Sequence, residues 1–229
     1  SLLNPLLMLA IYLFMFGIVF APRHGGAPAD LADFSLKLFA GLLIHGLFAE
    51  CLSRAPSLIV SQPSYVKKIV FPLEILPLVA VGAASVAYWI GMAILLFFCV
   101  VFGKSLGAGL WLLPLTWLPL LLLCCGTTWL LAALAVFLRD IGQLTGFLAS
   151  VLMFLSPIFY TTDSVPKLFR PLLQWNPLTI PIETARALIF SGTSPDWLAF
   201  GLHGVLSLAW AGFGLWFFQK VRKGFADVL

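Results

Sequence analysis

The stretch from Arg139-Asp140-Ile141-Gly142-Gln143 to Ser156-Pro157-Ile158-Phe159-Tyr160 decides the fold class. After the charged pair Arg139-Asp140 come about twenty residues without a formal charge, enough to cross the hydrocarbon core as a helix. The Ser156-Pro157 pair should break or kink that helix just before an aromatic pair. The stretch therefore predicts a transmembrane helix that leads into an irregular outer segment.

Small residues recur every four positions in this stretch, at Gly142, Gly146 and Ser150. Residues at this spacing share one face of a helix, and small side chains let a second helix approach closely. We therefore predict a helix-packing face at these three positions.

The composition of the whole chain places it in a membrane. Hydrophobic residues make up 62% of its 229 residues, charged residues make up 10%, and the mean hydropathy is +1.07. A soluble domain carries about 25% charged residues. Since one span needs about 20 residues, the chain has room for about six. The apolar runs are continuous and do not alternate, so we predict an all-α polytopic membrane protein, with residues 1–229 forming one transmembrane domain.

The cysteines and the net charge exclude several other classes. Because all four cysteines lie in or beside apolar runs, we expect neither a disulfide framework nor a metal site. A formal charge of +4 suits basic cytoplasmic edges and gives no indication of nucleic-acid binding. The four are Cys51, Cys99, Cys124 and Cys125.

The first two spans are predicted at residues 1–21 and about 36–52, with a turn-rich loop over residues 22–34. Tyr12, Phe16 and Phe20 form an aromatic stripe on the first span, a pattern that most often reflects helix packing. On the second span His45 is interpreted as a packing residue. Glu50 is expected to pair with Arg54, four residues later, at the membrane surface.

Residues 53–74 mix basic residues, prolines and a short apolar set. They predict either a short amphipathic helix on the membrane face or a solvated basic loop. Both interpretations place the segment in the cytoplasm.

The third and fourth spans are predicted at residues 75–102 and 110–138. The intervening Gly103-Lys104-Ser105 is not a P-loop, because Phe98 stands where that motif needs a glycine.

Residues 161–196 are expected to form short helices that dip into or cover the outer membrane face, broken at Asn176-Pro177. Glu183 and Arg186 stand three apart, where they could pair on one helical face. The last span, about residues 197–218, runs into Lys220, Arg222 and Lys223. These residues mark a cytoplasmic end.

Several of these stretches resemble the type-2 class of ABC exporter permeases, and within it the branch that exports bacterial cell-surface polysaccharides such as lipid-linked O-antigen. The resemblance covers nearly the whole chain and depends on the order and spacing of its pieces. These are Ser1-Leu2-Leu3-Asn4-Pro5-Leu6, Val66-Lys67-Lys68-Ile69-Val70-Phe71-Pro72-Leu73-Glu74-Ile75-Leu76-Pro77, Arg139-Asp140-Ile141 through Tyr160, Asn176-Pro177 and Lys223-Gly224-Phe225-Ala226-Asp227-Val228-Leu229.

The resemblance implies a homodimeric, non-enzymatic permease that works with two copies of a separate ATP-binding subunit. That subunit would hold ATP and Mg²⁺, and this chain would bind no cofactor and have no catalytic residue. The cargo would be lipid-linked polysaccharide, passing through a channel between the two permease chains.

The resemblance also implies two sets of site residues and a location. Membrane lipid would surround the chain in the cytoplasmic (inner) membrane of a bacterium, with both termini cytoplasmic. The chain starts after the amphipathic cytoplasmic helix that family members usually carry, so that helix would be missing here. ATPase coupling would involve Ser64, Tyr65, Val66, Lys67, Lys68, Arg139 and Asp140. The translocation path would involve Tyr12, Phe16, Phe147, Phe154, Phe159 and Tyr160.

Three alternatives stay open. A membrane enzyme acting on lipid-linked sugars would use Glu50, Glu183 or His203, but these lie on separate segments with no shared motif. A secondary transporter would usually show an internal repeat or a coupling acid in mid-helix, and neither is clear. The same family could also carry capsule polymer, teichoic acid or a drug.

Overall fold

The computed structural model describes residues 28–63, 72–104, 106–107, 109–138, 140–160, 165–191 and 195–228, together with residues 7, 10, 11 and 14. All regular secondary structure in these ranges is helical. The long and short α-helices are α3 (Pro28–Arg54), α4 (Ser57–Val60), α6 (Ile75–Val101), α7 (Leu113–Phe137), α8 (Ile141–Leu155), α9 (Arg170–Gln174), α10 (Thr179–Arg186), α11 (Trp197–Val221) and α12 (Phe225–Val228). The other turns are η2 (Leu110–Leu112), the π-helical η4 (Ala187–Ser191) and η5 (Arg222–Gly224).

Four helical segments are long and apolar enough to cross a membrane, namely Ala32–Arg54, Ile75–Val101, Leu110–Phe137 and Trp197–Gly224. They correspond to the second, third, fourth and last predicted spans, which confirms the all-α polytopic class. The first predicted span lies outside the described residues except at four positions.

The predicted length of the remaining span, α8, was wrong. This helix has 15 residues, which is about 22 Å and shorter than a hydrocarbon core of about 30 Å. It ends at Leu155, and Ser156 leaves in an extended conformation with ψ of 148°. The break predicted at Ser156-Pro157 is therefore confirmed, and it limits α8 to 15 residues.

Helix α3 starts earlier than predicted, at Pro28 instead of near residue 36, so the predicted loop is already helical from residue 28. Proline is well tolerated in a first helical turn, where its missing N–H would have no helical partner. Asp33 supports the early turns because its carboxylate lies 2.6 Å from Lys37 Nζ, four residues on.

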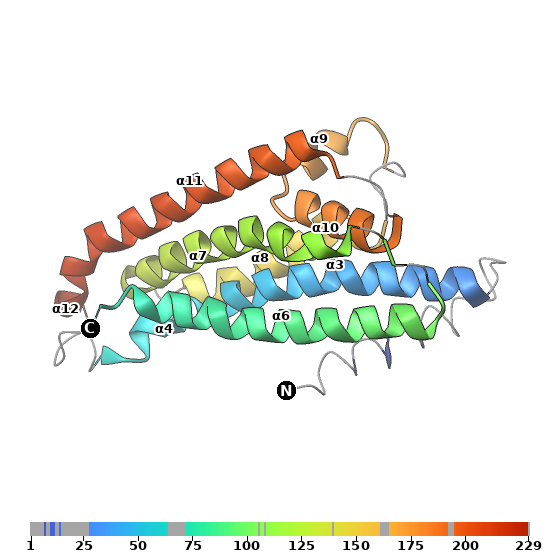
Figure 1. Ribbon diagram of the computed structural model, residues 1–229. Coiled ribbons are helices and arrows are strands. Elements are labelled where there is room, and N and C mark those ends of the chain that lie inside the picture. The colour runs from blue at the N-terminus through green and yellow to red at the C-terminus, as the bar shows by residue number, and fades with distance from the viewer. Residues whose placement is uncertain are drawn as a thin grey trace.

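The long helices lie side by side, and the short ones gather at the two ends of the bundle (Figure 1). Helices α4 and α12 lie at one end of the bundle, which we call the α12 end. At this end α6 and α8 begin, and α3, α7 and α11 finish. Helices α9 and α10 lie at the other end, called the α10 end. Two surfaces far apart along the bundle therefore carry the irregular segments.

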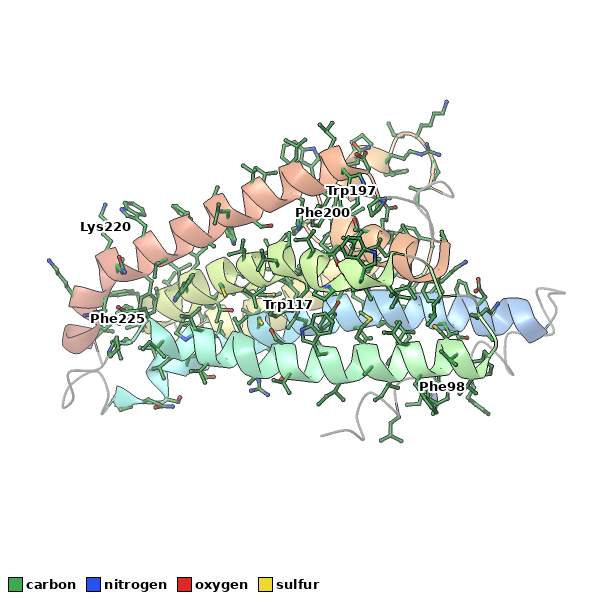
Figure 2. The ribbon with its side chains drawn as sticks, viewed as in Figure 1. Phe98, Trp117, Trp197, Phe200, Lys220 and Phe225 are labelled. Carbon is green, nitrogen blue, oxygen red and sulfur yellow. The ribbon has the colours of Figure 1, made fainter. Side chains whose placement is uncertain are left out.

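Helix α7 occupies the interior of the bundle, in contact with α3, α4, α6, α8, α10 and α11. In the most apolar 18-residue windows, 72% of the α3 span and 67% of the α7 span is buried, against 39% for α6 and 22% for α11. Helix α11 therefore presents most of its apolar surface outward, with Trp197 and Lys220 near its two ends (Figure 2). Tryptophan and lysine at such positions are typical of the two membrane interfaces.

Candidate functional site

One face of α8 is lined by aromatic side chains that the rest of the described chain leaves uncovered. Phe147 and Phe154 are 71% and 66% exposed. They stand seven residues apart, which places them on the same helical face about two turns from each other. This face is uncharged and open in the single chain.

The aromatic face continues past the end of α8. The Phe154 and Phe159 rings stack with centroids 6.2 Å apart, and the Tyr160 hydroxyl donates to the Phe154 carbonyl at 3.1 Å. Partial burial raises the pKa of Tyr160, so its hydroxyl stays protonated at neutral pH. The structure thus brings three predicted path residues together and places Phe147 on the same face of α8. The predicted Tyr12 and Phe16 lie outside the described residues.

The opposite face of α8 packs against α3. Thr145 is buried, and His45 Nε2 of α3 lies 2.9 Å from the Ala149 carbonyl oxygen. His45 is therefore a packing residue, as predicted, and it fixes the rotation of α8 so that the aromatic face points away from α3.

The small-residue row of α8 lies beside the aromatic face and is exposed. A Cβ added at Gly146 would meet nothing within 4 Å, and one at Gly142 would meet only Pro56 Cβ at 4.0 Å. Ser150 is also exposed. The helix packing predicted at these positions has no partner among the residues that the structure describes, and it stays a prediction.

Two proline motifs from the sequence meet at the α10 end. Asn176 Nδ2 donates to Ser156 Oγ at 2.9 Å, and the Leu178 amide donates to Asn176 Oδ1 at 2.9 Å. All of these groups are buried. The Asn176 side chain therefore closes the turn before α10 and ties that turn to the break after α8. Helix α9 ends at Gln174 and α10 begins at Thr179, so the helix break predicted at Asn176-Pro177 is confirmed.

Arg186 closes the same junction from the last turn of α10. Its Nε donates to the Lys37 carbonyl at 2.9 Å, and its two terminal nitrogens donate to the carbonyls of Pro157 and Ile158. The guanidinium thus supplies donors to one helix, α3, and to the backbone freed by the Ser156-Pro157 break. The sequence predicts a pairing of Arg186 with Glu183, three residues earlier. The structure adds hydrogen bonds from Arg186 to residues far away in the sequence.

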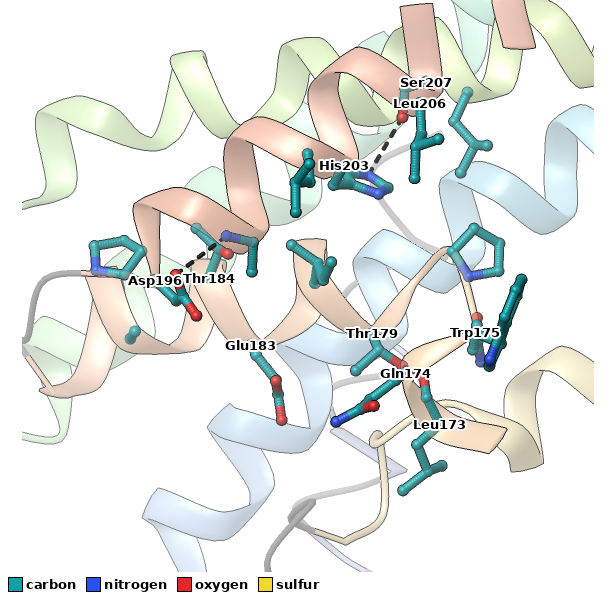
Figure 3. Close-up of a pocket in the computed structure, with 18 of the residues that line it drawn as sticks. Leu173, Gln174, Trp175, Thr179, Glu183, Thr184, Asp196, His203, Leu206 and Ser207 are labelled. Carbon is teal, nitrogen blue, oxygen red and sulfur yellow. Dashed lines mark hydrogen bonds between the residues drawn. The ribbon is translucent and has the colours of Figure 1, made fainter. Parts of the chain in front are cut away.

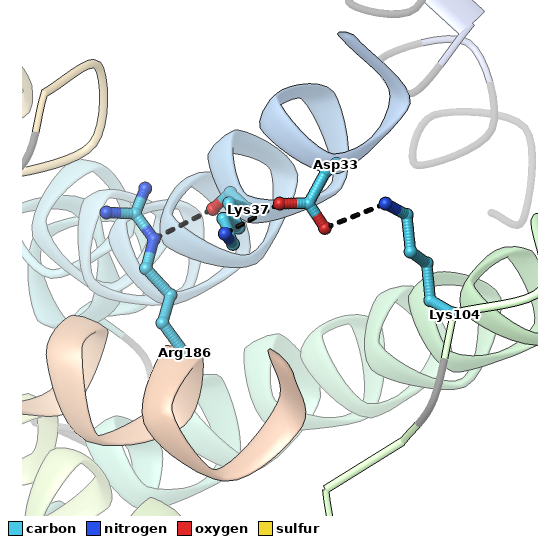
Figure 4. Close-up of polar contacts among 4 residues, drawn as sticks. All are labelled: Asp33, Lys37, Lys104 and Arg186. Carbon is cyan, nitrogen blue, oxygen red and sulfur yellow. Dashed lines mark hydrogen bonds and ion pairs between the residues drawn. The ribbon is translucent and has the colours of Figure 1, made fainter. Parts of the chain in front are cut away.

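An ion-pair cluster extends this junction towards the loop after α6. Asp33 of α3 lies 2.6 Å from Lys37 Nζ and 3.2 Å from Lys104 Nζ (Figure 4). Lys104 belongs to the Gly-Lys-Ser sequence, and Gly103 before it has a φ of 64°. Gly103 and Lys104 therefore form a helix-terminating turn and a structural ion pair.

The predicted ATPase-coupling residues are only partly visible. Ser64, Tyr65, Val66, Lys67, Lys68 and Arg139 lie outside the described residues. Asp140 is exposed at the α12 end, immediately before α8. Helix α4, which precedes the coupling segment, is a single turn that buries Ile59 and packs against α7.

Glu74 anchors the chain where it returns from the coupling segment, a role that the sequence analysis missed. Its carboxylate lies 2.6 Å from an Arg222 guanidinium nitrogen, and its carbonyl accepts from Trp129 Nε1 at 3.0 Å. One residue therefore links the start of α6 to the middle helix α7 and to the turn after α11.

The carboxyl-terminal tail also packs into the α12 end. Phe225 is fully buried, with its ring 5.5 Å from Phe218 and 5.9 Å from Phe137 between centroids. Glu50, at the same end of α3, lies 2.6 Å from Arg54, so the predicted ion pair is confirmed.

A cavity of about 1190 Å³ opens between α9, α10 and the first half of α11. Glu183 of α10 and His203 of α11 both line it (Figure 3). The two residues lie on separate helices, as the sequence indicates, yet they line one cavity, whereas Glu50 lies at the other end of the bundle. Nothing in the local sequence signals this shared cavity, because it depends on how α10 packs against α11.

The four cysteines are free and buried in the core. Within the described part of the chain, no three His, Cys, Asp or Glu side chains form a group that could hold a metal ion.

Apolar helices of spanning length and an uncharged open face on α8 define a polytopic α-helical membrane protein. The chain belongs to the ABC-2 type transporter family, whose model matches residues 1–190. It is 24% identical over 231 residues to an O-antigen export system permease protein RfbA of Klebsiella pneumoniae, covering 100% of this chain and 86% of that protein.

Two other relatives cover nearly as much of the chain. An O-antigen export system permease protein RfbA of Myxococcus xanthus is 24% identical over 232 residues, covering 99% of this chain and 85% of that protein. The polysialic acid transport protein KpsM of Escherichia coli is 25% identical over 218 residues, covering 94% and 82%. The resemblance drawn from the sequence motifs is confirmed at the level of the family.

Proposed function

We propose that this chain is the permease subunit of an ATP-driven exporter that moves lipid-linked cell-surface polysaccharide of the O-antigen type across a bacterial cytoplasmic membrane. Two copies form a channel between them, and two copies of a separate ATP-binding subunit hold ATP and Mg²⁺. The observation that carries the proposal is similarity over essentially the full chain to relatives named as O-antigen export permeases.

The open face of α8 supports a path between two chains. Phe147 and Phe154 present large aromatic surfaces in an uncharged setting, together with Phe159 and Tyr160 at the α10 end. Aromatic faces contact sugar rings without demanding one orientation, which suits a polymer that slides. The adjoining Gly142, Gly146 and Ser150 row leaves room for a second helix to approach.

The energy for transport is assigned to a partner because the sequence contains no Walker motif. The α12 end is the natural place for that partner. It carries Glu50 and Arg54, Asp140, and the basic residues Lys220, Arg222 and Lys223. We accordingly assign the α12 end and both termini to the cytoplasm and the α10 end to the outer side.

The testing experiment is purification of the full-length protein from its native membrane in mild detergent, with identification of copurifying proteins and assay of ATPase activity. We expect a stoichiometric nucleotide-binding subunit and vanadate-sensitive hydrolysis. A homo-oligomer without ATPase activity would contradict the proposal and favour a membrane enzyme built on the cavity that contains Glu183 and His203.

Cargo is then tested by complementation. A deletion strain should regain surface O-antigen when it receives this gene together with its ATPase partner. Restoration of an acidic capsule instead would favour the kind of cargo named for the polysialic acid relative.

A further inference from the structure

The second half of α11 carries an exposed aromatic face that ends in a cation. Phe213 and Trp216 are 44% and 53% exposed, and their ring centroids lie 6.0 Å apart. Lys220 stands four residues after Trp216, so the three side chains share one side of the helix. Figure 2 shows Lys220 projecting from the outer side of α11, away from the bundle. We call the side formed by Ala209, Gly212, Phe213, Trp216 and Lys220 the α11 outer face.

The other side of α11 is the packed one. Its buried residues in this half of the helix are Ala211, Gly214 and Phe218, which recur at helical spacing. Helix α7 is the principal neighbour of α11. The α11 outer face therefore points away from α7, towards what surrounds the protein.

The Lys220 ammonium is held against the Trp216 ring. Its Nζ lies 4.8 Å from the ring centroid, which is within the range of a cation–π contact. Lys220 forms no ion pair with any carboxylate side chain that the structure describes. An ammonium has three donors and no acceptor. The contact with the ring therefore fixes the position of the cation and leaves its donors available to an external anion.

The charges near the α11 outer face also favour an anionic partner. The Glu74 carboxylate lies 2.6 Å from Arg222, and the Glu50 carboxylate lies 2.6 Å from Arg54. Two acidic side chains of the α12 end are therefore already paired with arginines. Lys223, about one turn after the face ends, is exposed and adds a second cation. A phosphate placed here meets lysines in excess of unpaired carboxylates within this part of the described chain.

The apolar part of the face has the shape and length for an acyl chain. Ala209 and Gly212 lie beside Phe213, and a Cβ added at Gly212 would meet nothing within 4 Å. These small residues leave a shallow depression next to the rings. From Ala209 to Lys220 the face is about 16 Å long. One leaflet of the hydrocarbon core is about 15 Å thick, so an acyl chain can lie along the whole face with its headgroup at Lys220.

We propose that the α11 outer face binds one anionic phospholipid, with its phosphate at Lys220 and an acyl chain along Phe213 and Trp216. A zwitterionic phospholipid would bring an ammonium of its own next to the lysines, and like charges placed together cost binding energy. The occupant is a lipid of the surrounding membrane, so the inference depends neither on the cargo nor on the ATP-binding subunit.

The experiment is native mass spectrometry of the full-length protein, purified in mild detergent and mixed with one phospholipid at a time. The probes are phosphatidylglycerol and phosphatidylethanolamine with identical acyl chains. We expect the ion with one bound lipid per chain to be about fivefold more abundant with phosphatidylglycerol. Glycerol phosphate added in excess should not displace the lipid, because it lacks the acyl chains that contact the rings.

A charge variant with a matched control tests the headgroup contact. Lys220→Gln removes the cation and keeps most of the side-chain length, so it should bring the ratio between the two lipids close to one. Lys167→Gln removes the same charge at an exposed position between α8 and α9 and should keep the preference for phosphatidylglycerol.

A ring variant with its own control tests the aromatic contact. Trp216→Leu removes the ring that holds the ammonium, so it should lower phosphatidylglycerol binding about threefold. Trp197→Leu makes the same exchange at the opposite end of α11, where Trp197 is 46% exposed, and should leave binding unchanged. Size-exclusion chromatography of each variant reports folding and oligomeric state.

Four results would overturn the proposal. Equal binding of the two lipids would show that the face holds bulk lipid, and an undiminished preference in Lys220→Gln would place the anionic lipid elsewhere. Displacement by glycerol phosphate would indicate a site for a free anion. A change of oligomeric state in Trp216→Leu would assign the face to a contact between copies of the chain.

Discussion

Gly214 of α11 lies directly against Gly126 of α7. A Cβ added at Gly214 would overlap the Gly126 carbonyl oxygen and lie 2.9 Å from Gly126 Cα. A Cβ added at Gly126 would lie 2.7 Å from the Trp210 carbonyl oxygen. The two helices therefore touch through their backbones, a contact that small residues allow in a membrane.

Gly214→Ala should destabilise the protein, because the new methyl group must push α11 off backbone atoms that cannot rotate away. Overpacking of this kind costs about 1–3 kcal/mol. Unfolding in mixed micelles measures the change. Gly212→Ala is the matched control on the same helix, since a Cβ there meets nothing within 4 Å. If both variants are equally stable, the contact between α11 and α7 does not require a residue without a side chain at Gly214.

Arg186→Lys should loosen the junction at the α10 end although the charge is kept. A lysine cannot present the fork of donors that reaches the carbonyls of Lys37, Pro157 and Ile158 together. We expect a loss of about 1.5–3 kcal/mol in unfolding free energy and reduced export. Lys167→Ala, at an exposed position between α8 and α9, should change neither. A fully stable, active Arg186→Lys protein would assign the junction to other contacts.

Replacing Phe147 and Phe154 by alanine should reduce export while leaving folding intact. Both rings are mostly exposed, so their removal empties little packed volume in the single chain. Surface O-antigen on whole cells reports export, and size-exclusion chromatography reports dimer assembly. The same outcome is expected for Tyr12→Ala and Phe16→Ala. Unchanged export with intact dimers would remove these aromatic residues from the path.

The ion pair between Glu74 and Arg222 should matter more for coupling than for stability. The pair is partly exposed, with side chains 26% and 43% accessible, and such pairs contribute about 0–1 kcal/mol. Arg222→Glu should lower the number of glycan chains exported per ATP hydrolysed, and the swap with Glu74→Arg should recover part of it. A swap no better than the single variant would indicate that each residue acts separately.

Lys67→Glu together with Lys68→Glu should separate ATP hydrolysis from export while the permease still inserts into the membrane. The reason is electrostatic: if Lys67 and Lys68 belong to the proposed docking surface, reversing their charges repels a partner matched to a basic surface. Membrane fractionation, ATPase activity and export are measured on the same cells. Normal coupling in this double variant would move the contact with the ATP-binding subunit elsewhere.

Local signals in the sequence were sufficient where the structure depends on near neighbours. The Ser156-Pro157 break follows from the covalent limits of proline, and the pairing of Glu50 with Arg54 follows from helical spacing. The start of α3 was missed because a proline and turn-forming residues read as a loop, whereas proline is also a good residue for a first helical turn.

Long-range partners could not be predicted in the same way. The carbonyls that Arg186 binds lie 28, 29 and 149 residues away in the sequence. Glu183 and His203 line one cavity only because α10 packs against α11. Residue spacing in the sequence does not predict which residues of two different helices will lie near each other. These contacts arise from tertiary packing, which a single sequence does not encode in any local pattern.

The crossing of Gly126 and Gly214 divides α11 into two unequal arms. The arm from Gly214 to Asp196 is about 27 Å long and the arm from Gly214 to Arg222 about 12 Å, at 1.5 Å per residue. If α11 turned as a rigid rod about this contact, a displacement of about 1 Å at Arg222 would move the Asp196 end by about 2.2 Å. A displacement at the α12 end would in this way be amplified at the opposite end of α11, where the helix borders the cavity with α9 and α10.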